Sequence, residues 1–244
     1  MFHQWGNNKV IFLVYRAIVF LYTLAWIIAD LTVYYQPRYW IFLTNWVEVI
    51  GCLYFCLAFF LALYGYFASK QDIDREKGTN WGCGVVWILF NVSINAAVIT
   101  DILFWALLSN GLSPAQLADP FNIHSHAINL VLLLIDLFVF SYPIRILHLI
   151  YPMGLGLVYT AFTLILHGAR YTSAVYAVIN WQTFPALAAG VCFGASLVAM
   201  PISHLLVFGL YKIRALIARK NGCMSQQGGD QSFEMGQTNM AYDN

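Results

Sequence analysis

Six apolar stretches, most of them about as long as a bilayer is thick, dominate the sequence. They cover residues 10–29, 40–68, 83–108, 124–142, 147–166 and 184–211. A helix needs about 20 mainly apolar residues to cross the hydrocarbon core, and only helices or closed barrels satisfy their backbone groups in lipid. Charged residues make up only 9% of the 244 positions, against about 25% in a soluble domain. We therefore predict an all-α polytopic transmembrane bundle of about six spans.

The polar C-terminal end differs in composition from the rest of the chain. Residues 221–244 are rich in Gln, Gly and Ser and poor in large apolar side chains, so they cannot bury enough surface to fold. We predict a transmembrane domain at 1–220 and a disordered cytoplasmic tail at 221–244. Cys223 follows a basic segment, and two interpretations stay open for it: palmitoylation or a free thiol.

The basic residues predict that both termini are cytoplasmic. With six spans, that orientation assigns nine lysines and arginines to the inner segments and two to the outer ones, while Arg16 falls within the first span. The nine are Lys9, Lys70, Arg75, Lys77, Arg145, Lys212, Arg214, Arg219 and Lys220, and the two are Arg38 and Arg170. This is the bias of the positive-inside rule. Whether the membrane is the plasma membrane or an endomembrane stays open.

Charge and cysteine usage exclude several classes of partner. A net charge of +1 gives no electrostatic basis for nucleic-acid binding, and the five cysteines show no metal-site spacing. His124 and His126, two residues apart on a helix, point in different directions and do not form a metal pair. For haem the best pair is His126 with His167, and neither helix carries a second histidine that would complete another haem-binding layer. We predict no metal and no cofactor, with membrane lipids as the expected partners; protein partners stay open.

Ionisable residues inside the spans are costly in lipid and are therefore candidates for a functional site. The segment YWIFLTNWVEVIG at 39–51 opens the second span and carries Thr44, Asn45 and Glu48, of which Thr44 and Glu48 share a face. On the fourth span, His126, Asn129 and Asp136 follow one stripe. On the third span the polar residues are Asn91, Asn95 and Asp101. The predicted orientation brings Thr44, Asp101 and His126 to the outer half of the bundle.

These residue types suit a nucleophile activated by a base. A threonine hydroxyl attacks an ester only when a base takes its proton, and histidine is the usual base. We predict Thr44 as nucleophile and His126 as base, with Asp101, Glu48 or Asp136 as the unranked orienting group. The amides of Asn45 and Asn129 are candidates for an oxyanion donor. The alternative is that these polar groups only join helices by hydrogen bonds.

Two segments carry a resemblance to a known family. FLTNW at 42–46 and HAINLVLLLIDLFVFSYPIRILHLIYP at 126–152 resemble the rolling stone family of multi-pass membrane proteins, whose pattern runs H-x-I-N, I-D-L and then P-x-R-x-x-H-x-x-Y-P. The matching residues are His126, Asn129, Asp136, Pro143, Arg145, His148, Tyr151 and Pro152. The resemblance implies an integral membrane protein, and the namesake of the family is linked to myoblast fusion.

The chain is also similar, more distantly, to the androgen-induced and androgen-dependent membrane hydrolases. Those proteins cleave fatty acid esters of hydroxy fatty acids with a threonine and a histidine. The threonine follows an aromatic–Leu pair, which here gives Thr44, and the histidine precedes an acidic residue by ten positions, which gives His126 with Asp136. That family has glutamate at the acidic position. Two hypotheses follow: a rolling-stone-type protein acting in cell fusion, and a Thr/His-dependent lipid-ester hydrolase acting from the outer half of the bilayer.

Overall fold

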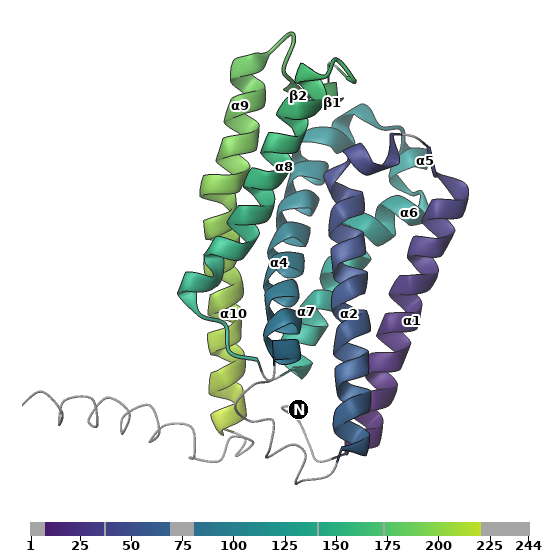
Figure 1. Ribbon diagram of the computed structural model, residues 1–244, viewed down its shortest axis with the longest axis vertical. Coiled ribbons are helices and arrows are strands. Elements are labelled where there is room, and N and C mark those ends of the chain that lie inside the picture. The colour runs from purple at the N-terminus through teal and green to yellow at the C-terminus, as the bar shows by residue number, and fades with distance from the viewer. Residues whose placement is uncertain (1–7, 37, 69–80, 141, 173, 221–244) are drawn as a thin grey trace, which may run out of the picture.

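The computed structural model describes residues 8–36, 38–68, 81–140, 142–172 and 174–220 (Figure 1). Six helical segments in these ranges are long and apolar enough to cross a membrane: Lys9–Val33, Leu43–Phe67, Trp81–Gly111, Pro120–Val139, Ile146–Gly168 and Pro185–Lys220. The six predicted spans are thereby confirmed by length and composition. The predicted tail at 221–244, with Cys223, lies outside the described residues.

The spans are built from regular helices joined to shorter turns of other geometry. The long helices are α1 (Lys9–Val33), α2 (Leu43–Phe67), α4 (Trp81–Leu103), α7 (Asn129–Val139), α8 (Ile150–Gly168), α9 (Pro185–Gly194) and α10 (Met200–Lys220). Three π-helical segments continue them: η2 (Phe104–Leu108), η4 (His124–Ile128) and η6 (Ala195–Ala199). Short 3-10 turns occupy η1 (Tyr39–Ile41), η3 (Ser109–Gly111) and η5 (Ile146–Leu149).

The connection at 109–122, which the sequence suggests is a loop, contains two one-turn helices with recognisable caps. Ser113 begins α5 (Pro114–Leu117) with a reciprocal capping box to Gln116. Asp119 begins α6 (Pro120–Ile123) by accepting a hydrogen bond from the Phe121 backbone N–H at 2.9 Å. A proline follows each cap, where its missing N–H costs nothing. The fourth span therefore begins at Pro120 instead of residue 124.

A β-hairpin follows the fifth span, where the sequence suggests only a loop around Arg170. Strands β1 (Ala174–Tyr176) and β2 (Ile179–Asn180) pair antiparallel, with Tyr176 opposite Ile179. The β-branched residues Val175 and Ile179 favour the two strands. The all-α prediction holds for the six spans, and the hairpin is a short addition outside them.

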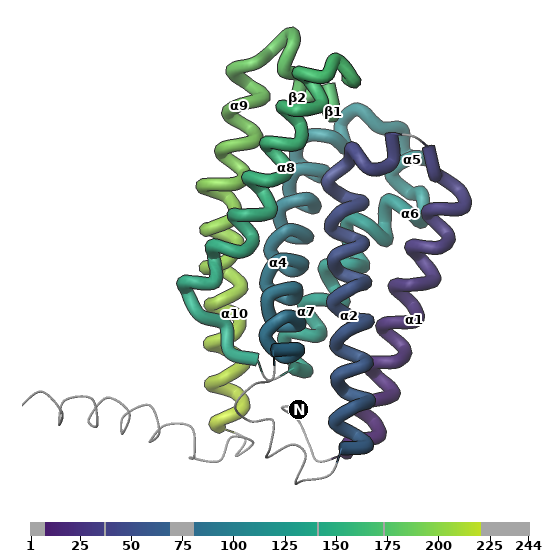
Figure 2. The backbone as a smooth tube through the Cα atoms, viewed as in Figure 1, coloured from purple at the N-terminus to yellow at the C-terminus, as the bar shows by residue number. Residues whose placement is uncertain are grey.

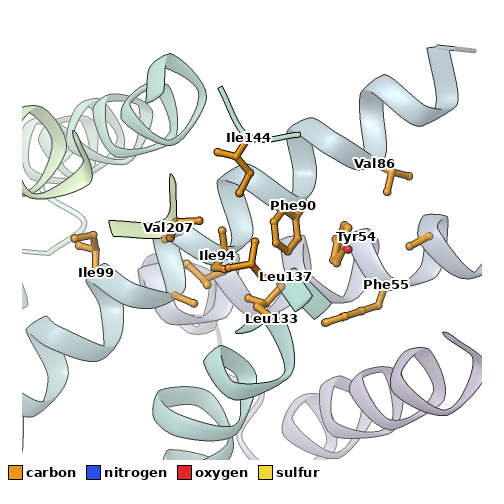
Figure 3. Close-up of a cluster of buried hydrophobic side chains, with 14 of the residues drawn as sticks. Tyr54, Phe55, Val86, Phe90, Ile94, Ile99, Leu133, Leu137, Ile144 and Val207 are labelled. Carbon is orange, nitrogen blue, oxygen red and sulfur yellow. The ribbon is translucent and has the colours of Figure 1, made fainter. Parts of the chain in front are cut away.

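Helix α4 lies at the centre of the bundle, in contact with α2, α7, α8 and α10 (Figures 1 and 2). Its buried face packs into the largest core cluster, in which Phe90 and Ile94 meet Tyr54 of α2 and Leu137 of α7 (Figure 3). The start of α1 and the end of α10 lie at the same end of the bundle, and the hairpin with α5 and α6 lies at the opposite end (Figure 1). The hairpin end of the bundle is where the predicted site residues Thr44 and His126 lie, at the starts of α2 and of the fourth span.

A fully buried ion pair ties α1 to α7. Arg16 Nη1 donates to Asp136 Oδ2 at 2.9 Å, and neither side chain is exposed. The same carboxylate accepts hydrogen bonds from the hydroxyls of Tyr15, at 3.1 Å, and of Tyr54. Arg16 also lies over the Phe140 ring, 4.6 Å from its centroid. Charges in lipid require such partners.

Arg214 binds the C-terminal end of α7, next to this ion pair. Its guanidinium donates to the carbonyls of Leu137, at 2.7 Å, of Phe140, and of Tyr142, at 2.9 Å. These are carbonyls that no residue within the helix can satisfy, and a cation is favourable at a helix C-terminus. Because Arg214 is buried within α10, the predicted excess of basic residues on the inner side falls from nine against two to eight against two.

Candidate functional site

A small apolar cavity of about 60 Å³ lies at the hairpin end of the bundle. Its walls come from α2, α4, α8, α9, α10, the hairpin and the π-helical segments. They comprise Leu43, Thr44, Ile99, Thr100, Leu103, Phe104, Leu107, Leu108, His126, Gly156, Tyr159, Thr160, Tyr176, Val178, Ile179, Val191, Cys192, Ala195, Ser196 and Met200. Thr44 and His126, the predicted nucleophile and base, both line it.

All three π-helical segments among the described residues border this cavity. Phe104 belongs to η2, His126 to η4 and Ser196 to η6. A π-turn holds one extra residue, which widens the helix and displaces its side chains from the regular 3.6-residue face, and such segments are frequent at functional sites. The cavity therefore depends on local departures from α-helical geometry in three different spans.

His126 is held in place by residues of η2. Its ring stacks on the Phe104 ring with centroids 3.8 Å apart and planes 5° apart. Its carbonyl accepts a hydrogen bond from Trp105 Nε1 at 2.8 Å, and its backbone leaves the helical region at φ −115°, ψ 15°. His124 instead stacks on Trp26 of α1, with centroids 4.6 Å apart. The two histidines point in different directions, as the sequence predicts.

Asp101 is the carboxylate beside His126. Its Oδ1 lies 3.6 Å from His126 Nδ1, and both side chains are more than 90% buried. Neither of these two atoms has a hydrogen-bond partner. Buried polar atoms without partners are rare and often mark a functional site. A small rotation would bring the pair into hydrogen-bond range, with the imidazole proton on Nδ1 and Nε2 left as the basic nitrogen.

Thr44 lies in the first turn of α2, where backbone N–H groups have no partner within the helix. The Leu43 N–H donates to the Tyr176 hydroxyl of the hairpin at 2.9 Å. Burial raises the pKa of Tyr176, and the neighbouring Leu43 and Thr44 oppose that rise. The start of α2 therefore presents a backbone donor to the Tyr176 oxygen at the cavity wall.

A second, more polar cavity of about 580 Å³ adjoins the first, and we call it the vestibule. It shares Phe104, Leu108, Thr44, His126 and Tyr176 with the apolar cavity. The remaining lining residues are Asp30, Tyr34, Phe42, Asn45, Leu112, Gln116, Asp119, Phe121, Asn122 and Ser125. Thr44 and His126 therefore lie where an apolar space and a polar space meet.

The other predicted orienting groups lie elsewhere. Asp136 is bonded to Arg16, Tyr15 and Tyr54, so that its oxygens are occupied away from His126. Glu48, one turn after Thr44 on α2, accepts a hydrogen bond from the Ser125 hydroxyl. This bond joins α2 to η4. Neither carboxylate lines either cavity, whereas Asp101 contacts the histidine directly.

The two predicted oxyanion donors are also separated. Asn45 Nδ2 donates to the Tyr39 carbonyl at 2.7 Å, and Asn45 lines the vestibule. Asn129 lies against Gly51 in the middle of α2, where a Cβ on Gly51 would meet its Oδ1 at 3.4 Å. Its Nδ2 is buried without a partner, and Asn129 borders neither cavity.

Sequence reasoning missed the hairpin residue Tyr176 and the aromatic pair Phe104 and Trp105. The alternation in SAVYAVIN after Arg170 is a strand signal that could have indicated the hairpin. No sequence signal indicates the π-turn that places Phe104 on His126. Over the described residues, no three His, Cys, Asp or Glu side chains lie close enough to hold a metal ion.

Comparisons with known proteins agree with the architecture. The family model described as "Protein rolling stone" matches residues 2–226. The chain is 27% identical to "Protein rolling stone" of Drosophila melanogaster over 230 residues, which cover 88% of this chain and 83% of that protein. No significant match to a solved structure was found. A family match over this much of the chain, together with six candidate spans, shows that the chain belongs to the rolling stone family of multi-pass membrane proteins.

Proposed function

We propose that this protein is a membrane-embedded lipid-ester hydrolase in which Thr44 is the nucleophile, His126 the general base and Asp101 the orienting carboxylate. The observation that carries the proposal is a cavity wall shared by two of the groups, together with a carboxylate beside the histidine. Thr44 and His126 line the same apolar cavity, and the unpartnered Nδ1 of His126 faces the unpartnered Oδ1 of Asp101 at 3.6 Å. A nucleophile, a base and an orienting group in this relation are typical of covalent hydrolytic catalysis.

The reaction proceeds in two half-reactions. Thr44 Oγ1 bonds to the ester carbonyl carbon while its proton passes to His126 Nε2. The bond to the alcohol oxygen then breaks, and the leaving alkoxide takes the proton from His126. Water attacks the acyl-threonine in the same way, which releases the fatty acid and restores the Thr44 hydroxyl. Asp101 stabilises the imidazolium that forms in each half-reaction.

The start of α2 supplies the oxyanion donors in this scheme. The Leu43 N–H donates to the Tyr176 oxygen, and preorganised N–H donors at a helix N-terminus stabilise negative charge on a substrate oxygen. In the reactive state the Thr44 hydroxyl turns toward His126, since catalytic hydrogen bonds tighten when substrate binds. The apolar cavity holds the part of the acyl chain next to the carbonyl. Asn45 and Asn129 have no part in the proposed step.

A fluorophosphonate probe tests the proposal, because it reacts with activated hydroxyl nucleophiles. Wild-type protein should be labelled, and Thr44→Ala and His126→Ala should each abolish labelling. Thr32→Ala is the matched control, since Thr32 is exposed on α1 with its hydroxyl bonded to the Ala29 carbonyl, and it should label like wild type. Absence of labelling in folded wild type, or labelling that survives both substitutions, refutes the hydrolase.

Family membership supports a second proposal, a role in cell fusion. The connections at the hairpin end are short, the longest being residues 169–184 between α8 and α9, which leaves little surface for a protein partner. Lipid chemistry is then the contribution that this fold can make to fusion. In fusion-competent cells deprived of their own copy, wild type should restore fusion and Thr44→Ala should not. Restoration by Thr44→Ala would separate the two roles.

A further inference from the structure

The polar vestibule contains negative charge without a matching cation. Asp30 and Asp119 both line it. No Lys or Arg is found among the described residues that line it, and this includes Arg38 and Arg170, the two arginines predicted on the outer side. His126 is the one nitrogen base in that lining, and its Nδ1 is buried and unpartnered.

Neutral donors hold the two carboxylates in place. The Tyr34 hydroxyl donates to Asp119 Oδ2 at 2.8 Å, and the Phe121 N–H donates to Asp119 Oδ1 at 2.9 Å. The Tyr39 hydroxyl donates to Asp30 Oδ2. The hydrogen bond to Asp119 raises the pKa of Tyr34, so this phenol stays a neutral donor. Such bonds orient the carboxylates but do not cancel their charge.

Aromatic rings border the same space. The rings of Tyr34 and Phe121 meet edge to face with centroids 4.8 Å apart, and the ring centroids of Phe42 and Tyr176 lie 5.6 Å apart. All four residues line the vestibule. Carboxylates combined with aromatic faces favour an ammonium group, because both attract positive charge. A free carboxylate in this space would be repelled.

From this arrangement we infer that the vestibule binds the alcohol part of the ester and selects an alcohol that carries an ammonium group. The inference rests on the proposed hydrolysis at Thr44, which lies where the two cavities meet. The part of the acyl chain next to the carbonyl occupies the apolar cavity, and the ammonium group lies between Asp30 and Asp119. An ester whose alcohol part carries a carboxylate is a poor substrate.

Three esters with one acyl chain and different charge test the inference: palmitoylcholine, 2-hydroxyethyl palmitate and the palmitoyl ester of glycolic acid. Their dissociation constants are measured in neutral-lipid nanodiscs on Thr44→Ala protein, which cannot turn them over. The cationic ester should bind at least about tenfold more tightly than the anionic one. The double substitution Asp30→Asn, Asp119→Asn in the same background should remove that preference, and Asp230→Asn, beyond the family-matched residues, should leave it unchanged. Asn at position 119 can still cap the helix that follows. Asp30→Asn alone should reduce the preference for the cationic ester by half on a logarithmic scale.

Equal binding of the three esters, or a preference that persists in the double variant, overturns the inference. Turnover by the wild type separates this result from the proposed function. If wild type hydrolyses all three esters with equal kcat/KM, the hydrolase stands and charge selection is wrong. If wild type hydrolyses none while Thr44→Ala binds with the predicted charge preference, the hydrolase is wrong and the vestibule remains a cation site.

Discussion

The buried pair of Arg16 and Asp136 gives a prediction that separates architecture from catalysis. Both side chains are fully buried, and the Asp136 carboxylate accepts hydrogen bonds from Arg16, Tyr15 and Tyr54. Asp136→Asn removes the negative charge and leaves the guanidinium unpaired in the bundle interior. Loss of one partner of a buried pair costs about 3–5 kcal/mol. At roughly 2–4 °C per kcal/mol for a chain of this size, the unfolding midpoint should fall by roughly 10 °C.

Thermal unfolding followed by tryptophan fluorescence in nanodiscs measures this effect. The double variant Arg16→Met, Asp136→Leu removes both charges and fills the space with apolar groups, so most of the lost stability should return. Asp101→Asn is the control carboxylate, and it should lower the midpoint much less because its partner His126 can remain neutral. A midpoint unchanged in Asp136→Asn, or a double variant less stable than the single, refutes the reasoning. So would loss of activity without loss of stability in Asp136→Asn, which would place Asp136 in the site.

Three further predictions concern the cavity and its supports. Asp101→Asn should lower kcat for ester hydrolysis by about a hundredfold or more, with KM little changed; an unchanged kcat would remove Asp101 from the mechanism. Gly156→Ala should shift the preference toward shorter acyl chains, because the new Cβ would meet Ser196 Oγ at 2.6 Å and backbone at 3.2 Å in the cavity wall. An unaltered chain-length profile in folded protein would place the chain elsewhere. Arg214→Met should lower the free energy of unfolding by about 2 kcal/mol, because buried carbonyls at the end of α7 lose their hydrogen-bond donor. Unchanged stability in thermal unfolding would show that water replaces the guanidinium as donor.

Hydropathy was sufficient to predict the spans, because length and apolarity are properties of each segment alone. The boundaries at Pro120 and Lys220 differ from prediction for local reasons. Asp119–Pro120 is a helix start within a polar segment, and α10 continues beyond the apolar run as an amphipathic helix ending in basic residues. The hairpin at 174–180 was missed because its strands are short and follow a span directly.

The site was predictable in its residue types but not in its pairings. Helical spacing places His126, Asn129 and Asp136 on one stripe, and on that basis any of the carboxylates could orient the histidine. The structure distinguishes them because Arg16 on α1 occupies Asp136 and Ser125 occupies Glu48, which leaves Asp101 at 3.6 Å from His126. Those partners lie on other helices, and no spacing rule within one helix reports them.

The vestibule was not predictable for a related reason. Asp30 lies in the last turn of α1, and Asp119 caps a one-turn helix, so that in sequence each has an ordinary explanation. Their common role depends on the chain bringing the two segments beside Thr44, which is a tertiary property.

Mass spectrometry of the protein after reaction with a fluorophosphonate, read peptide by peptide, tests the central claim most directly. The account predicts one covalent adduct, on Thr44 in the segment 39–51, that is absent in His126→Ala and strongly reduced in Asp101→Asn. An adduct on Ser196 or Ser125, which line the same two cavities, or an adduct on Thr44 that His126→Ala leaves intact, would contradict it.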